Sequence, residues 1–136
     1  MNLGLILVFG LKTGIMNETQ ISADIRDMLE KEFSDIVEFT RHQCGVAKGF
    51  SGSFIRLGKK YWPDYIGFAA DGRFFGVEVK NPKSRTDKTR LYGQNDLRFR
   101  ICRRGGYCIQ TSSVEDCRKK MLLIKKIVLQ NLQKVL

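Results

Sequence analysis

The sequence has few of the residues that form covalent cross-links and zinc sites. Its 136 residues include four cysteines and one histidine. The cysteines form no C-x-x-C pair, and the histidine is close in sequence to only one of them; these residues are Cys44, Cys102, Cys108, Cys117 and His42. Zinc sites need tighter ligand spacing than this. The pattern argues against zinc and favours reduced thiols, which suits a cytoplasmic protein.

The chain also lacks an apolar run of about 20 residues, the length that a membrane-spanning helix needs. The apolar run at residues 3–11 is too short, and no basic residue precedes it as in a signal peptide. Met16 and a new helix start follow. We therefore interpret residues 1–15 as an extension that begins at an upstream start codon, with an extra strand or helical turn as the alternative. The basic, amphipathic C-terminal segment leaves a membrane-surface role open, although we expect no membrane partner.

No repeat, low-complexity tract or Pro/Gly/Ser-rich linker divides the chain, so residues 16–136 are expected to form one domain. Hydrophobic residues make up 43% and charged residues 28%, which is typical of a globular protein. Acidic residues are scarce: 24 Lys+Arg face 14 Asp+Glu, a net charge of +10. The electrostatic field of such a positively charged protein favours polyanionic partners, above all nucleic acid.

The pattern of apolar residues and turn signals predicts an α/β fold. Asn17 is expected to cap the first helix, with the Gln20 side chain reaching back as in a capping box. Asp71-Gly72 is the strongest hairpin-turn signal. Strands grouped in a hairpin and then continued through a helix imply a mixed central sheet flanked by helices. The expected elements are a helix at 18–33, a strand at 36–41, a loop at 42–53, a short strand at 54–57, strands at 64–70 and 73–80, a helix at 88–103, a strand at 107–110 and a last helix from Ser113.

Two carboxylates and a lysine lie on the neighbouring hairpin strands. Alternation places Glu78 and Lys80 on one strand face, and Asp64 begins the partner strand. A two-residue turn would direct Asp64 away from Glu78, whereas a three-residue turn or one bulge would pair Asp64 with Lys80 and bring all three to one face. Carboxylates that converge in this way form a site for Mg²⁺ or Mn²⁺. A solvated strand face is the alternative.

Two helical residues are further candidates. Glu18 opens the first helix, where it either complements the helix dipole or reaches inward toward the site. Gln94 lies on the inward face of its helix, between Leu91 and Leu97, where its amide could bond a lysine or a phosphate.

Together these motifs resemble the VRR-NUC family of the PD-(D/E)XK nuclease superfamily, over roughly residues 17–118. The resemblance includes a Gly-rich, basic loop before the first carboxylate and a Gly-Gly turn before the strand at 107–110. One departure is Trp62, where the family usually has a small residue or threonine before the proline. The residues that carry the resemblance are Glu18 with Gln20, Trp62-Pro63-Asp64, Glu78-Val79-Lys80, Gln94 and Gly105-Gly106.

The resemblance implies a restriction-endonuclease-like αβββαβ core and a Mg²⁺- or Mn²⁺-dependent DNA endonuclease. Asp64, Glu78 and the Val79 carbonyl would hold the metal, and Lys80 would assist the attacking water. Glu18 and Gln94 would support the site. Similarity to Holliday-junction resolvases further implies a homodimer, cleavage of branched DNA and a cytoplasmic enzyme of phage or bacterial type.

A one-signed run of basic residues follows these motifs and is expected to contact DNA phosphates; a solvated helix face is the alternative. No base-reading motif and no aromatic platform for single strands is evident, so the contacts should be independent of sequence. A non-catalytic nucleic-acid-binding module and a sequence-specific restriction-type nuclease are the alternative functions. The residues expected to contact phosphates are Lys83, Arg85, Lys88, Arg90, Arg98 and Arg100; Arg103 and Arg104 follow them, and only Asp87 and Asp96 oppose the positive charge.

Two apolar surfaces are candidates for the dimer interface. One is the apolar stripe of the last helix, which continues to Leu136, and the other is the aromatic segment with Phe50, Phe54, Tyr61 and Trp62. The sequence does not distinguish between them.

Overall fold

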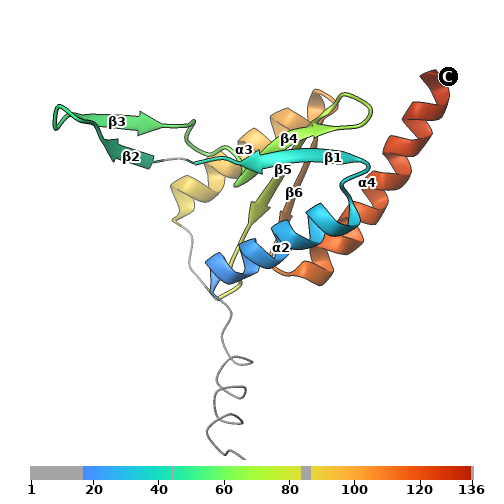
Figure 1. Cartoon of the computed structure of the whole chain (residues 1–136), viewed down its shortest axis with the longest axis horizontal. Helices are drawn as coiled ribbons and strands as arrows, with labels where there is room; N and C mark the ends of the chain where they lie inside the picture. The colour runs from blue at the N-terminus through green and yellow to red at the C-terminus, as the bar shows by residue number, and fades with distance from the viewer. Residues whose placement is uncertain (1–16, 44, 84–86, 136) are drawn as a thin grey trace, which may run out of the picture.

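The computed structural model describes residues 17–43, 45–83 and 87–135, and over these residues the fold is mixed α/β (Figure 1). The N-terminal extension, Cys44, Arg85 and Leu136 lie outside the described residues. The elements are α2 (Glu18–Glu32), β1 (Val37–Arg41), β2 (Gly45–Lys48), β3 (Phe54–Leu57), β4 (Tyr65–Ala69), β5 (Phe74–Val79), α3 (Lys88–Arg103), β6 (Tyr107–Thr111) and α4 (Val114–Val135).

A four-stranded mixed sheet with the order β1-β4-β5-β6 forms the centre of the fold. β1, β4 and β5 are antiparallel neighbours, whereas β6 runs parallel to β5 and is reached through the crossover helix α3. β2 and β3 form a separate antiparallel hairpin, which projects from the end of β1 (Figure 1). The predicted mixed sheet with flanking helices is thus confirmed.

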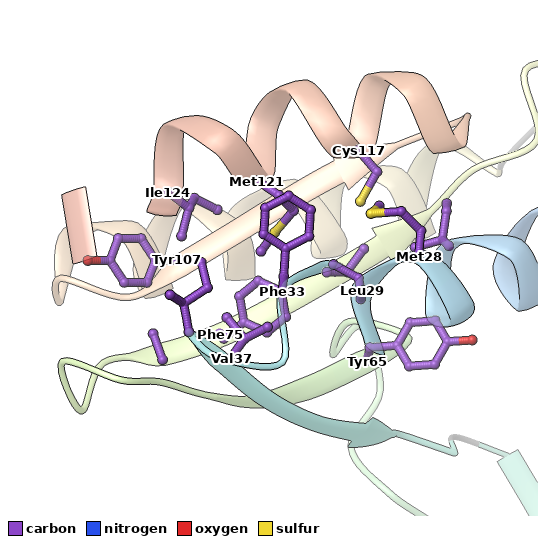
Figure 2. Packing of buried hydrophobic residues seen from close by; sticks show 14 of the residues in the cluster. Met28, Leu29, Phe33, Val37, Tyr65, Phe75, Tyr107, Cys117, Met121 and Ile124 are labelled. Atoms are coloured by element: carbon purple, nitrogen blue, oxygen red, sulfur yellow. The ribbon is translucent and has the colours of Figure 1, made fainter. Parts of the chain in front are cut away.

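Helices α2 and α4 cover one face of the sheet and build the hydrophobic core (Figure 2). Ile25 and Leu29 of α2 and Met121 of α4 have no exposed surface, and they meet Phe75 and Val77 of β5. Burial of these side chains provides the main stabilisation of the fold. The stripe predicted for the last helix is confirmed: Cys117, Met121, Ile124 and Val128 are buried, and Val114 and Leu132 pack against them.

Helix α3 lies on the opposite face of the sheet, where it buries Gln94 and Leu97. Because side chains alternate along β5, Phe75, Val77 and Val79 point into the core, and Glu78 points to the α3 side. α3 packs on β6 and the neighbouring part of β5. Phe68 of β4, on this same side, stays 54% exposed.

Three sequence expectations need correction. Residues 42–53 are not all loop, because Gly45–Lys48 forms β2 and pairs with β3. Asn17 caps α2 as predicted, by accepting the Gln20 N–H at 2.8 Å, but the Gln20 side chain bonds Asp24 instead of reaching back.

The third correction concerns the β4–β5 register. The turn consists of Ala70, Asp71 and Gly72, since Ala69 bonds Arg73 across it at 2.8 Å. Tyr65 pairs with Val77, and one further step places Asp64 opposite Glu78 rather than opposite Lys80. The predicted pairing is therefore wrong by one strand repeat. The required odd turn length is present, and it keeps the carboxylates on one face.

Candidate functional site

A cleft of about 650 Å³ opens where β4, β5, α3 and the β2–β3 hairpin meet. Three of the predicted catalytic residues line it: Asp64, Glu78 and Gln94. Its cationic lining comes from Arg41, Lys60 and Arg90. The cleft thus combines the Asp64 and Glu78 carboxylates with a basic rim, which also includes the exposed Asp87, and this arrangement is suited to a metal ion and a polyanion together.

Asp64 is held at the mouth of the β4–β5 pair by main-chain contacts. Its Oδ2 accepts the N–H of Val79 at 2.7 Å, and its carbonyl oxygen accepts the N–H of His42 at 2.7 Å. Pro63 packs beside Gly76, where an added Cβ would lie 2.9 Å from the proline ring. The absence of a side chain at residue 76 therefore lets Pro63 bring Asp64 against β5.

Glu78, Gln94 and Lys80 form one hydrogen-bonded network. Gln94 Nε2 donates to Glu78 Oε1 at 2.8 Å, and Gln94 Oε1 accepts from Lys80 Nζ at 2.5 Å. Lys80 Nζ also lies 3.2 Å from Glu78 Oε1. An amide carries both a donor and an acceptor, so Gln94 can bridge a carboxylate and an ammonium. The predicted interaction of Gln94 with a lysine is confirmed.

The environment of Glu78 favours its protonated form. Burial, followed by the charge of Asp64, raises the pKa of Glu78 to about 7, against the opposing effect of Lys80 and Arg90. The influence of Asp64 reflects the proximity of the two carboxylates in the cleft. A divalent cation would counter both desolvation and mutual repulsion and so favour two ionised carboxylates.

The donor set fits a hard divalent cation. Lys80 N–H pairs with Thr111 of β6, so strand alternation turns the N–H and C=O of Val79 toward Asp64. Within the described residues, no three Asp, Glu, His or Cys side chains gather into a metal-binding group. An ion here would therefore rest on the carboxylates of Asp64 and Glu78 with the Val79 carbonyl, all of them hard oxygen donors.

The wall of the cleft contains a strained residue. Tyr61 has a positive φ of 72°, a conformation that is unfavourable for an aromatic residue. Its ring packs on α3 at Gly93, where a Cβ would lie 2.7 Å from the ring. Strain of this kind persists where the surroundings impose it, often at a functional site. Here it brings Tyr61 beside Gln94.

Of the other predicted residues, Lys80 contacts Glu78, whereas Glu18, Arg98 and Arg100 are not among the residues that line the cleft. Glu18 is exposed at the start of α2 and is not among the residues that line the cleft. Lys80 reaches the network from a neighbouring hollow, which it shares with Arg98. Arg98 bonds Gln110 and Asn95, whereas Arg100 pairs with Asp96 on the outside of α3.

The remaining basic residues of the predicted run are Lys83, Lys88 and Arg90. All three are exposed, and Arg90 lines the cleft. Arg90 also lies close enough to Glu78 to lower the pKa of that carboxyl. Arg90 is therefore the member of the run that is best placed for a phosphate bound at the carboxylates.

Sequence reasoning missed Arg41, His42 and Lys60, which also line the cleft. Their place depends on how the chain leaves β1, forms the β2–β3 hairpin and returns beside Trp62. His42 Nε2 lies 3.2 Å from the main-chain nitrogen of Lys59 and closes this loop. The signal in the sequence that could have indicated Lys60 is the pair of lysines, Lys59 and Lys60, just before the Pro63-Asp64 motif.

Comparison with known proteins adds no assignment: no family model, no curated protein and no solved structure matches this chain. Over the described residues, none of the helices has the length and apolar character needed to cross a bilayer. The interpretation of the cleft therefore rests on its own residues.

Proposed function

We propose that this protein is a Mg²⁺- or Mn²⁺-dependent DNA endonuclease with a restriction-endonuclease-like core of the VRR-NUC type. The observation that carries this proposal is the arrangement of Asp64, Glu78, Gln94 and Lys80. Two carboxylates share a cleft, and a lysine is bonded to one of them through an amide bridge. The net charge of +10 and the basic rim of the cleft support a phosphodiester as substrate.

In the proposed reaction, a water oxygen adds to phosphorus, a P–O bond of the backbone breaks, and the leaving oxygen takes up a proton. Lys80 provides a cation beside the carboxylates, where it can hold the attacking water or offset charge on the phosphate oxygens. Gln94 orients Lys80 and Glu78 relative to each other. Arg90, Arg41 and Lys60 would position the DNA backbone.

The metal ion would be held by Asp64, Glu78 and the Val79 carbonyl. When bound, it would acidify a coordinated water and polarise the scissile phosphate. Ionised Glu78 is the form that binds a cation, so the ion must compete with the proton that burial favours on this carboxyl.

Cleavage of linear and branched DNA in Mn²⁺ or EDTA tests the proposal. We expect cleavage in Mn²⁺ only, with Asp64→Asn and Glu78→Gln each reducing it about 100-fold or more. Asp27→Asn removes an exposed carboxylate of α2 and serves as the control, with activity unchanged. Metal-independent binding without cleavage would instead identify the protein as a nucleic-acid-binding module.

The proposal extends to substrate choice, assembly and location. Arg41, Lys60 and Arg90 line the cleft and would contact the DNA backbone, and the sequence has no evident base-reading motif, so we expect cleavage selected by DNA shape, at junctions or flaps. A homodimer would place two cleavage sites on one branched substrate. Such an enzyme would act in the cytoplasm of a bacterial cell, as a bacterial or phage enzyme. Cutting of a linear duplex at one preferred sequence would identify a restriction-type nuclease.

A further inference from the structure

A second groove, of about 520 Å³, lies on the α3 side of the sheet, beyond the cleft. Aromatic and aliphatic side chains meet arginines in it: Trp62, Phe74, Leu97, Arg73, Arg100 and Arg104. Its lining contains no aspartate or glutamate among the described residues. The groove therefore differs from the cleft, whose lining has carboxylates at its centre.

The aromatic residues form a row across two strands. Phe68 pairs with Phe74 across β4 and β5, and partners in such a pair share a sheet face. Trp62 packs edge-on to Phe74, with ring centroids 5.7 Å apart. Because α3 covers only the β5–β6 side, Phe68 remains 54% exposed at the end of the row. The row is not evident in the sequence, because Phe68 and Phe74 become neighbours only through strand pairing, and neighbouring rings of this kind can stack unpaired bases.

Three arginines complete the lining, and one of them, Arg73, also forms an ion pair with Asp71 at 3.7 Å. Arg100 and Arg104 come from the last turn of α3 and its cap, and Arg73 follows the β4–β5 turn. Arg100 is 54% exposed, and its partner Asp96 lies on the outer surface of the helix at 3.0 Å. A phosphate could replace that solvated carboxylate at small cost. The spacing of cations beside rings fits a backbone that follows exposed bases.

We propose that this groove binds single-stranded nucleic acid, with bases on the row of Trp62, Phe74 and Phe68 and phosphates on Arg73, Arg100 and Arg104. Trp62 also lines the cleft, so the groove and the cleft meet at this residue. A strand that leaves the groove past Trp62 would reach Asp64. The assignment of this strand as the unpaired arm of a cleaved substrate rests on the proposed nuclease function. The binding of a single strand in the groove does not depend on that function.

Trp62 is the one tryptophan of the chain, and its fluorescence reports on binding in the groove and at the junction of the groove with the cleft. In EDTA, where cleavage is excluded, we expect oligo(dT) or oligo(rU) of about eight nucleotides to quench its fluorescence. Comparison of the two oligonucleotides shows which sugar the groove accepts. Inorganic polyphosphate, which has charge but no bases, should compete poorly. Absence of quenching by both oligonucleotides, or equal competition by polyphosphate, would overturn the proposal.

Variants outside the cleft distinguish the groove from the catalytic centre. Arg100→Gln with Arg104→Gln should weaken oligonucleotide binding about tenfold or more. Phe68→Leu keeps the apolar volume but removes the ring, and should weaken it about fivefold or more. Arg26→Gln, an exposed arginine of α2, is the matched control and should change nothing. Thermal melting checks that each variant is folded.

Wild-type binding by both groove variants would place the strand in the cleft alone and refute the assignment. If the wild-type protein does not cleave DNA in Mn²⁺ but its fluorescence is still quenched, only the proposed nuclease function would be refuted.

Discussion

At the scale of single residues, Gln94 links the acidic and basic parts of the site. Its amide donates to Glu78 and accepts from Lys80, both of which are largely buried. Gln94→Ala should leave a carboxylate without its donor and a lysine without its acceptor. We expect cleavage to fall about 10- to 100-fold, as for other residues that orient metal ligands. The Mn²⁺ concentration for half-maximal cleavage should rise as well.

The neighbouring residue provides a control for Gln94. Asn95 is an exposed amide on the same helix and bonds only Arg98, so Asn95→Ala should cleave normally. A Gln94→Glu variant keeps an acceptor for Lys80 but loses the donor to Glu78, and should recover part of the activity at most. Full cleavage by Gln94→Ala with an unchanged Mn²⁺ requirement would show that the bridge is only structural.

Strand alternation and helix geometry were enough to predict much of the site from sequence. A period of two places Glu78 and Lys80 on one face, and the inward position of Gln94 between two leucines predicts its contact with a lysine. Lys60 could not be predicted, because it reaches the cleft only through the path of a hairpin whose residues are almost all exposed, and Arg41 ends β1 without any motif that marks it as a site residue. No burial pattern marks that path in the sequence.

At the scale of secondary structure elements, periodic segments were predicted well and turns poorly. Helices α2 and α4 each bury a regular stripe, which specifies their bounds closely, whereas α3 buries only Gln94 and Leu97 and is bounded by its Asp87 cap and the Gly105-Gly106 turn. Strand β2 shows no such alternation and lies among glycines. The Asp71-Gly72 dipeptide predicted a turn of two or three residues that begins at Asp71. In the structure the turn begins at Ala70 and ends at Gly72, which has a φ of 82°. One residue of turn placement was sufficient to change the strand partner of Asp64.

Asp71 joins three elements through its buried carboxylate, whose side chain is 5% exposed. Burial alone would raise the pKa of Asp71, but hydrogen bonds from Asn131 of α4 and Tyr107 of β6, together with Arg73, lower it below its usual value. The unfolded chain therefore binds this proton more readily than the folded chain. The stabilisation is complete above the unfolded pKa of about 4 and is lost as pH falls through the lower folded value.

Replacement of this carboxylate should show the same dependence. Asp71→Asn should lower the free energy of unfolding by about 1–3 kcal/mol at pH 7, because hydrogen bonds to a charged group are lost. The deficit relative to the wild type should shrink as urea unfolding is repeated at successively lower pH below 4. Asp27→Asn, at an exposed carboxylate, should produce a small deficit without this trend. A deficit for Asp71→Asn that is constant over the acid range would contradict the linkage.

At the scale of the whole molecule, the exposed apolar residues bear on the proposed homodimer. On the outer face of α4 they are mixed with lysines, whereas one face of the β2–β3 hairpin carries Ala47, Ile55 and Leu57 without a charge. A two-stranded hairpin that projects alone is marginally stable in water. The hairpin also borders the cleft through Val46 and Leu57. A second copy that covers the hairpin would both stabilise it and bring the two clefts into one assembly.

We therefore expect the β2–β3 hairpin rather than α4 to form the dimer interface, and one residue from each tests this. Ile55 is 53% exposed and Leu123 on α4 is 65% exposed, so a glutamate at either site should leave the fold of one subunit intact. Light scattering at micromolar concentration should give a dimer for the wild type and for Leu123→Glu. Ile55→Glu should give a monomer, because it buries an unpaired charge in the interface. The opposite pattern would move the interface to α4, and a wild-type monomer would remove the dimer altogether.

If Ile55→Glu is a monomer, its cleavage of branched DNA should be confined to one strand per binding event, since a single cleft remains on each bound molecule.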